Sequence, residues 1–277
     1  MTGRTVRKSP RSRLDAELVR RGLARSREQA ADLIAAGRVT VSGEAAAKPA
    51  TQVTRAAPIT VTENDGDPGY VSRGGHKLAG ALAAFPGLTV TGRYCLDAGA
   101  STGGFTDVLL RAGAAHVTAA DVGYGQLAWA LQTDPRVTVL DRVNVRSLQP
   151  EQVAGPDGRR PDLVVADLSF ISLALVLPAL AGSADENADF VLLVKPQFEV
   201  GKGRVGAGGV VRDAGLRAEA VTSVGEAAGA LGLGVRGVTA SPLPGPAGNV
   251  EYFVWLRRGA PPLDDEDLRR AMAEGPQ

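Results

Sequence analysis

The sequence predicts an α/β protein in two parts, a small α+β module over residues 1–62 and a larger doubly wound domain over residues 71–277. Beyond residue 71, short apolar runs alternate with helical patterns, which indicates a mostly parallel sheet with helices on both faces. The segment 63–70 is rich in Pro, Gly and Asp, as linkers are. Residues 1–60 hold 12 Lys and Arg against 5 Asp and Glu, whereas the rest of the chain holds 19 against 25.

Composition narrows the class of protein. A chain of 277 residues with 44 % hydrophobic residues is long enough for a substantial core. The one cysteine, Cys95, excludes a disulfide within the chain, and His76 and His116 are too few for a His-rich metal centre. No apolar run reaches the roughly 20 residues of a membrane span, and residues 1–13 are basic without a following apolar stretch. We therefore expect a cytoplasmic protein with no metal site and no membrane segment.

The residue pattern of the first module predicts two helices followed by a small sheet. Leu14 and Leu18 are spaced for one helix face, and Gly22 stands where that helix is expected to end. Ser26 is a candidate N-cap for a second helix, with Gln29 placed to bond back to it. This helix is expected to stop at Gly37. Short strands are expected at 38–41, near Val53 and at 59–61.

This module resembles the S4 RNA-binding domain over nearly its whole length. The resemblance is carried by 13–15, 22–27, Ala30, 33–34, 37–39, Val41, Gly43 and 48–49. It implies a helix pair whose arginines contact RNA phosphates, with Arg13, Arg27 and Lys48 as the contacts. A basic module attached to an acidic body favours a negatively charged partner such as RNA. The alternative is that each of these residues is a solvated surface charge in an Arg-rich chain.

Seven apolar runs predict the strands of the larger domain. They lack polar alternation, as strands buried on both faces do. The runs are 94–96, 117–120, 137–140, 163–166, 190–194, 235–240 and 252–256. Ligands bind at the carboxyl ends of the strands in open α/β sheets, so the residues that follow these runs are the first functional candidates.

The first run ends in a glycine-rich turn, 97–106, that leads into a helix. Such a turn lets a ligand approach the backbone at a helix N-terminus. Its spacing, Asp-x-Gly-x-x-x-Gly-Gly, differs from the dinucleotide pattern and places Asp97 where it could order the amino-acid part of S-adenosylmethionine. Asp121, at the end of the second run, is placed to accept hydrogen bonds from ribose hydroxyls. The predicted cofactor-binding residues are Asp97, Gly99, Ser101, Thr102, Gly103, Gly104, Phe105, Thr106, Asp121, Val122, Asn144 and Asp167.

Four charged residues stand at the ends of elements. Asp167 and Lys195 each follow a buried strand, and we expect both at the carboxyl edge of the sheet. Lys77 opens the first helix of the domain, and Glu251 begins the last strand. A structural ion pair between Lys195 and Asp167 is the alternative for that pair. Either Lys77 or Glu251, considered alone, would be interpreted as a solvent-exposed surface charge.

The larger domain closely resembles the TlyA (hemolysin A) family of ribosomal RNA methyltransferases, whose catalytic half is of the FtsJ/RrmJ type. The resemblance is carried by 72–78, 97–106, 121–127, 167–172, 194–199 and 248–252. It implies a Rossmann-like class I methyltransferase that uses S-adenosylmethionine, and a catalytic tetrad of Lys77, Asp167, Lys195 and Glu251. It further implies methylation of cytidine ribose in 16S or 23S ribosomal RNA and sensitivity to antibiotics of the capreomycin and viomycin type. Arg73 and Arg142 are further expected RNA contacts.

The chemistry of the tetrad suits this activity. A ribose hydroxyl is a poor nucleophile at neutral pH and needs a nearby base. We expect Lys195 to be that base, with a pKa lowered by partial burial and by the Lys77 ammonium. Lys77 would stabilise the developing oxyanion, while Asp167 and Glu251 orient the two amines. The alternatives are a dehydrogenase with an RNA-binding module, a non-catalytic ribosome-binding protein and a pore-forming hemolysin.

Overall fold

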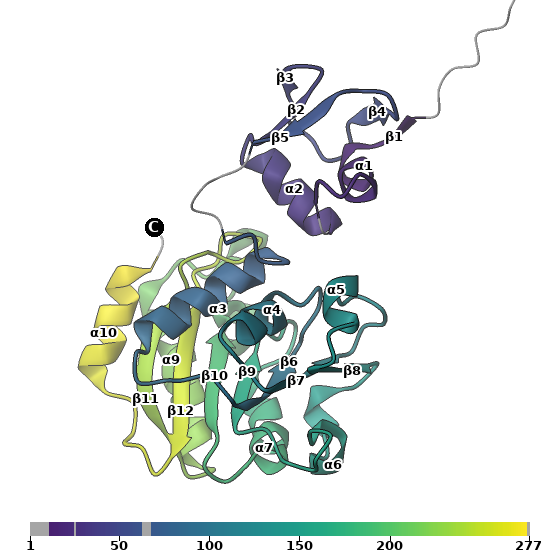
Figure 1. Ribbon diagram of the computed structural model, residues 1–277. Helices are drawn as coiled ribbons and strands as arrows, with labels where there is room; N and C mark the ends of the chain where they lie inside the picture. Colours follow the sequence, from purple (N-terminus) through teal and green to yellow (C-terminus); the bar gives the residue numbers. More distant parts are fainter. Residues whose placement is uncertain (1–10, 25, 63–67, 276–277) are drawn as a thin grey trace, which may run out of the picture. The chain divides into compact units, whose positions relative to one another are not determined.

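The computed structural model describes residues 11–24, 26–62 and 68–275, so part of the expected linker, 63–67, lies outside the described residues. The chain divides into two compact units, and the boundary along the sequence falls between Arg73 and Gly74. Figure 1 shows the elements of each. None of the described helices has the length and apolar content needed to cross a membrane.

The N-terminal unit has the two expected helices and the expected short strands, together with two short strands that were not expected, at Arg11–Arg13 and Glu44–Ala45 (Figure 1). Its elements are β1 (Arg11–Arg13), α1 (Leu14–Arg20), α2 (Arg27–Ala35), β2 (Val39–Val41), β3 (Glu44–Ala45), β4 (Gln52–Thr54) and β5 (Ile59–Val61). Strand β1 pairs with β4, and β2 pairs with β3 and β5, all antiparallel. Leu14, Leu18, Ile34 and Val53 form the core between the helices and the strands.

The expected helix ends of this unit are confirmed. Gly22 and Gly37, just beyond the ends of α1 and α2, have the left-handed φ values of 71° and 68° that glycine favours. The Ser26 hydroxyl caps α2 by accepting a hydrogen bond from the Gln29 N–H at 3.1 Å. The Gln29 side chain, expected to bond back to Ser26, donates instead to the Tyr70 carbonyl at 3.5 Å.

The C-terminal unit is a seven-stranded sheet in the order β11-β12-β10-β9-β6-β7-β8. The strands are β6 (Tyr94–Ala98), β7 (His116–Asp121), β8 (Val137–Asp141), β9 (Leu163–Ala166), β10 (Asp189–Val194), β11 (Leu233–Ala240) and β12 (Tyr252–Arg258). Strands β6 to β10 pair in parallel, whereas β12 runs antiparallel to both β10 and β11. The predicted fold class, a doubly wound and mostly parallel α/β sheet, is confirmed.

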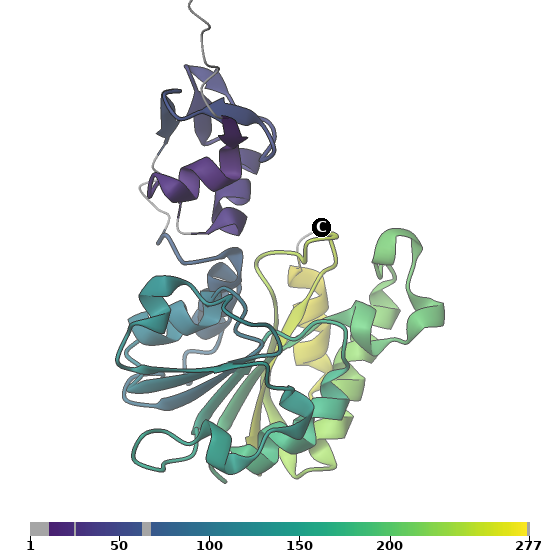
Figure 2. The same cartoon turned by 90° about the vertical axis from the view of Figure 1, so that its right-hand side faces the viewer.

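Helices cover both faces of this sheet (Figures 1 and 2). They are α3 (Arg73–Ala84), α4 (Gly104–Arg111), α5 (Trp129–Gln132), α6 (Pro150–Val153), α7 (Leu173–Ser183), α8 (Pro196–Glu199), α9 (Ala214–Gly229) and α10 (Asp265–Glu274), with short 3-10 turns at Val145–Ser147, Lys202–Arg204 and Ala207–Gly209. Helices α3 and α4 lie on one face, and α7 and α9 lie on the other.

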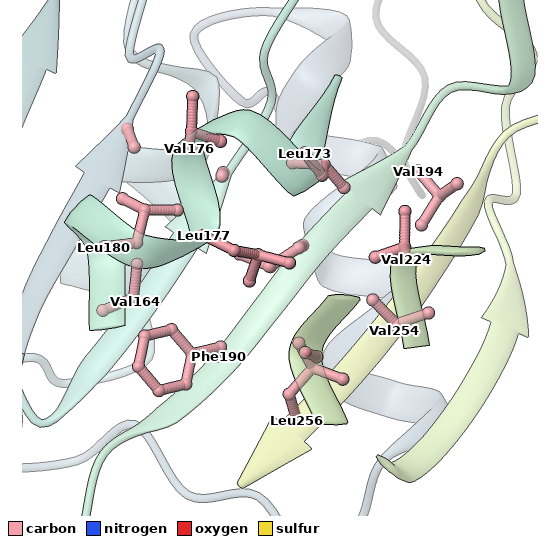
Figure 3. Packing of buried hydrophobic residues seen from close by; sticks show 14 of the residues in the cluster. Val164, Leu173, Val176, Leu177, Leu180, Phe190, Val194, Val224, Val254 and Leu256 are labelled. Carbon is pink, nitrogen blue, oxygen red and sulfur yellow. The ribbon is translucent and has the colours of Figure 1, made fainter. Parts of the chain in front are cut away.

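The larger core lies between the sheet and the α7–α9 layer. Leu173 and Leu177 of α7 pack with Phe190 of β10 and Val224 of α9, all at most 2 % exposed (Figure 3). Each fully buried side chain of this size contributes about 1.5–3 kcal/mol to folding. This packing holds β9 and β10 rigidly side by side, so the residues that follow them are fixed in relation to each other.

Candidate active site

Strand register brings three of the four predicted tetrad residues to one edge of the sheet. Asp167 directly follows β9, and Lys195 directly follows the parallel neighbour β10. Glu251 directly precedes β12, which is antiparallel to β10 and pairs Tyr252 with Val194. Because β12 runs backwards, its beginning lies at the carboxyl edge of its neighbours. Lys77 reaches Glu251 from α3, on one face of the sheet.

The four side chains form two ion pairs. Lys77 Nζ lies 2.6 Å from Glu251 Oε2, with both side chains buried. Lys195 Nζ lies 2.5 Å from Asp167 Oδ1 and donates a hydrogen bond, 2.9 Å long, to Ser169 Oγ. Breaking either pair would leave a buried or half-buried charge without its partner, which is costly. The ion pair between Lys195 and Asp167, weighed above as a structural alternative, is therefore present.

A cavity of about 550 Å³ opens at this edge and includes the Asp167 end of that ion pair. A volume of this size suits a nucleoside-sized ligand. Its position, outside the carboxyl ends of β6, β7 and β9, is the usual ligand site of open α/β sheets. The lining residues are Gly99, Ser101, Asp121, Val122, Gln126, Val143, Asn144, Val145, Asp167, Leu168, Ser169, Phe170, Ile171 and Val176.

Six residues predicted to bind a cofactor line this cavity: Gly99, Ser101, Asp121, Val122, Asn144 and Asp167. The Asp121 carboxylate accepts hydrogen bonds from the Ser101 N–H at 2.8 Å and from the Gly123 N–H at 2.6 Å. It thereby ties the turn after β6 to the turn after β7. The Asn144 side chain accepts from the Arg146 N–H at 3.0 Å. Asp121 and Asn144 are therefore held in place before any ligand arrives.

The other predicted residues lie behind the cavity wall, in and around the first turn of α4. Asp97 and Thr106 are fully buried, and the Thr106 hydroxyl donates to Asp97 Oδ2 at 2.6 Å. The Phe105 ring packs against the Phe253 ring, with their centroids 6.0 Å apart. Thr102, Gly103 and Gly104 complete this turn. None of these residues lines the cavity, so any contact with its occupant would come from their backbone or from Asp97 after local adjustment.

Asp97 has an unusual environment. Burial, helped by the nearby charge of Asp167, raises the pKa of the Asp97 carboxyl to about 7, although the Thr106 hydrogen bond opposes this. Its Oδ1 atom is buried and accepts no hydrogen bond from the part of the chain that is described. A buried oxygen without a donor is uncommon and indicates a missing partner.

Glycine is required at two points of the turn for different reasons. Gly99 has a φ of +86°, and a Cβ there would lie 2.6 Å from the Asp167 carbonyl oxygen, so the turn packs directly on the end of β9. Gly103 has a φ of +98°, and a Cβ there would lie 2.3 Å from Leu131 and 2.8 Å from Leu127. Glycine is therefore required at position 103 because a side chain would collide with two leucines of the same domain. The sequence pattern predicted a cofactor contact at this residue.

Sequence reasoning missed much of the apolar wall. Leu168, Phe170 and Ile171 line the cavity from the loop between β9 and α7. Phe170 is 91 % exposed, has a φ of +65° and lies with its ring 5.2 Å from that of Phe198. These residues directly follow Asp167. The rule that loops after parallel strands line the ligand site could have identified them.

The RNA contacts predicted in the N-terminal unit are partly engaged within that unit. Arg13 and Arg27 each form an ion pair of 2.9 Å with Asp15, which is only 4 % exposed. The Arg13 guanidinium, together with that of Arg27, holds the pKa of the Asp15 carboxyl well below its usual range. Both arginines remain about half exposed and can contact another molecule. Lys48 is exposed.

Two further predicted RNA contacts lie at the start of α3 and after β8. Arg142 is exposed, with a φ of +59°, and its guanidinium lies 4.3 Å from the centre of the Tyr124 ring. Arg73 is half-buried at the first residue of α3. Among the described residues, no group of three or more His, Cys, Asp or Glu side chains is arranged to hold a metal ion.

A doubly wound sheet with a cavity at its carboxyl edge and a Lys-Asp-Lys-Glu set beside it defines a Rossmann-like methyltransferase with an appended small domain. Residues 70–258 match the family of FtsJ-like methyltransferases, and residues 12–58 match the S4 domain. The chain is 62 % identical over 272 residues, 96 % of its length and 99 % of the relative's, to the 16S/23S rRNA (cytidine-2'-O)-methyltransferase TlyA of Mycobacterium tuberculosis. The chain belongs to the TlyA family of FtsJ-like methyltransferases.

Two other relatives agree over most of the chain. Hemolysin A of Brachyspira hyodysenteriae is 38 % identical and covers 87 % of this chain and 98 % of its own. The solved structure of a provisionally named hemolysin from Streptococcus thermophilus is 37 % identical to this chain, with a TM-score of 0.75. The match covers 96 % of this chain and 98 % of that protein.

Proposed function

We propose that this protein transfers a methyl group from S-adenosylmethionine to the 2'-oxygen of cytidine in 16S or 23S ribosomal RNA. The observation that carries the proposal is the pair of lysine–carboxylate contacts at the carboxyl edge of the sheet, one of which reaches the cavity through Asp167, because paired amines and acids beside a ligand cavity suit the deprotonation of a hydroxyl. The name of the Mycobacterium tuberculosis relative supports the same substrate. A ribosomal substrate would place the protein in the cytoplasm and make cells sensitive to capreomycin and viomycin.

The residues of the cavity fit S-adenosylmethionine. Asp121 and Asn144 present polar groups to the cavity of about 550 Å³, and apolar side chains from the loop after β9 line another part of it. Asp97 Oδ1, which accepts no hydrogen bond from the described residues, lies behind the cavity wall and would accept from an ammonium group after local adjustment. When bound, this cofactor supplies an electrophilic methyl group on a positively charged sulfur.

The tetrad residues then have separate tasks. Lys195, held by Asp167 and Ser169, first releases its ammonium proton to solvent, and its neutral amine then takes the proton from the 2'-hydroxyl at Nζ. Lys77, held by Glu251, places a positive charge near the oxygen as it becomes negative. The carboxylates fix both amines, so the chain contributes mainly alignment and electrostatic stabilisation. No step in this scheme calls on a metal ion.

The experiment that tests the proposal is in vitro methylation of purified ribosomal subunits. The subunits come from cells that lack this protein, and small and large subunits are incubated separately with the enzyme and methyl-labelled S-adenosylmethionine. We expect label on the 2'-oxygen of cytidine in at least one subunit, mapped by alkaline resistance and mass spectrometry. Label confined to bases, or no label in either subunit, would contradict the proposed function. Antibiotic sensitivity of the same cells with and without the gene tests its consequence.

We further propose that the N-terminal unit supplies RNA affinity, and Lys48 is the cleanest position to test this. Reversing the charge of Arg13 or Arg27 would expose Asp15 to a like charge and disturb the unit itself. Lys48→Gln removes an exposed charge instead, and should reduce the slope of log affinity against log salt for ribosomal RNA by about one unit. Binding measured at several salt concentrations checks this.

The control for Lys48 is Arg55→Gln, an exposed cation of the same unit that was not predicted to contact RNA. We expect its salt slope to match that of the parent protein. Equal losses in the two variants would show that only the total charge matters and would remove Lys48 from the contact surface. Calorimetric affinity for S-adenosylmethionine should stay the same in both.

A second prediction concerns Asp97 and pH. The ionised carboxylate binds a cationic ligand, and the pKa of Asp97 is raised to about 7 by burial. Cofactor affinity should therefore rise with pH and level off above pH 7, changing by up to about tenfold per pH unit below it. Asp97→Asn should bind weakly and lose this pH dependence. Asp121→Asn is the control, because it should weaken binding while keeping the pH dependence, as calorimetry between pH 5.5 and 8.5 can measure.

The raised pKa of Asp97 also makes the free energy of unfolding depend on pH. The folded-state pKa of Asp97 lies above its ordinary value of 3.8, so its stabilising effect is complete below about pH 4 and is lost as pH rises to about 7. Three pKa units correspond to roughly 4 kcal/mol at most. The free energy of unfolding of Asp97→Asn, relative to the parent protein without ligand, should therefore increase between pH 4 and pH 7. A constant difference across this range would contradict the raised pKa.

A further inference from the structure

Ser169 is the second polar contact of Lys195. The Lys195 amine donates to Ser169 Oγ at 2.9 Å and lies 2.5 Å from Asp167 Oδ1. Ser169 is exposed and lines the cavity, whereas Lys195 is 8 % exposed and does not. We propose that Ser169 is a positioning residue that aims the lone pair of the Lys195 amine at the hydroxyl to be methylated. This inference rests on the proposed function.

The reasoning starts from the geometry of an amine. A neutral lysine amine has two N–H bonds and one lone pair, arranged tetrahedrally around Nζ with the bond to Cε. If Asp167 were the only acceptor, rotation about the Cε–Nζ bond would leave the lone pair free to take either of two staggered positions. Ser169 accepts one N–H bond, and the Asp167 carboxylate, 2.5 Å from Nζ, attracts the other electrostatically. Only one direction is then left for the lone pair.

The same two contacts serve the amine after it accepts a proton. When the O–H bond of the substrate breaks, its proton forms a third N–H bond at Nζ, and the electron pair of the O–H bond stays on the oxygen. The hydrogen bond to Ser169 and the close contact with Asp167 can both remain, because an ammonium has three donors. No reorganisation of Asp167 or Ser169 is needed, which is the condition for efficient electrostatic catalysis.

The backbone supports this assignment. Strands β9 and β10 are parallel, with Ala166 opposite Leu192, so Ser169 and Lys195 each lie three residues beyond a paired position. The next residue, Phe170, has a φ of +65°, which turns the chain sharply after Ser169. The end of the buried strand β9 and the turn at Phe170 thus fix the position of the Ser169 hydroxyl.

The test compares Ser169→Ala with Ser169→Thr. The alanine variant removes the acceptor, and at saturating cofactor and RNA its single-turnover rate of methyl transfer should fall by about tenfold to a hundredfold. Threonine retains a hydroxyl and should restore the rate to within about threefold of the parent. Cofactor affinity by calorimetry should change less than about twofold in either variant, because the effect lies in the rate and not in binding. Ser223→Ala, at an exposed position of α9, is the matched control for removal of a hydroxyl.

A second readout does not require turnover. Competitive labelling of lysines with acetic anhydride, followed by mass spectrometry, should show Lys195 reacting several times faster in Ser169→Ala than in the parent, Ser169→Thr or Ser223→Ala. Parent-like rates of methyl transfer in Ser169→Ala would overturn the inference. So would a loss that disappears at high cofactor concentration, since Ser169 would then be a cofactor ligand.

These outcomes are separable from the proposed function. If the parent protein methylates no ribose, the proposed function fails, while the labelling experiment still reports whether Ser169 holds the amine. If the parent methylates ribose and Ser169→Ala does so equally fast, only the positioning role fails.

Discussion

Lys195→Arg is expected to fold, to bind cofactor and RNA, and to transfer methyl groups at least about a hundredfold more slowly than the parent. Arginine keeps the positive charge and can still pair with Asp167, but it does not lose a proton at any pH compatible with folding. The substitution therefore separates two tasks of the same side chain, base and charge. Single-turnover kinetics with ribosomal subunits measure the rate, and thermal unfolding and calorimetry check that folding and cofactor binding are intact.

Lys77→Arg is the matched comparison. Lys77 is assigned only an electrostatic task, and arginine retains its charge and its contact with Glu251. We therefore expect Lys77→Arg to keep much more activity than Lys195→Arg when both fold equally well. Substantial turnover by Lys195→Arg would eliminate it as the base, and the methyltransferase assignment would stand on the family and the cavity. Equal losses in the two variants would mean that the shape of the site, and not proton transfer, limits the rate.

Gly103→Val is expected to destabilise the C-terminal unit by about 3 kcal/mol or more. Two costs add: a side chain at a φ of +98° is strained, and its Cβ would lie 2.3 Å from Leu131 and 2.8 Å from Leu127. These leucines are at most 6 % exposed and have little room to move. Chemical denaturation of the full chain, followed by a signal from Trp255, measures the loss.

Gly125→Val provides the control. Gly125 also has a positive φ, +62°, but nothing lies within 4 Å of a Cβ placed there. It should show only the cost of backbone strain, about 1–2 kcal/mol. The two variants unfolding at the same denaturant concentration would mean that contact with the leucines is not what requires glycine. A Gly103→Val protein that folds normally but cannot bind S-adenosylmethionine would restore the earlier expectation of a direct cofactor contact.

Local signals in the sequence were reliable where the physical cause is also local. Gly22 and Gly37 end helices because they accept a left-handed backbone, and Ser26 caps α2 through an N–H three residues away. The runs of the central strands were recognisable because burial on both faces demands continuous apolar residues, whereas the edge strands β8 and β11 are only partly buried. The positions of Asp167 and Lys195 at the carboxyl edge followed from the polarity of a parallel sheet, with no further knowledge of the fold.

Other features depended on contacts between distant segments. Glu251 reaches the site only because β12 runs against β10, a direction that the run 252–256 does not reveal. Asp15 lies two residues from Arg13 in the chain, but its contact with Arg27 needs the helix pair to fold. The packing of Gly103 against Leu127 and Leu131 likewise appears only when α5 is in place.

The fold class, the two-part distribution of charge and the glycine-rich turn could be predicted from the sequence, as could the four residues proposed as a tetrad, because each depends on local periodicity or on a short motif. Only the folded structure shows which carboxylate contacts which lysine, that Asp97 is buried with an oxygen that has no donor among the described residues, and that Lys195 donates a hydrogen bond to Ser169. The physical reason is that pairing and burial depend on distances between residues far apart in the chain. Strand order, strand direction and side-chain packing set those distances, and no short window of sequence contains them.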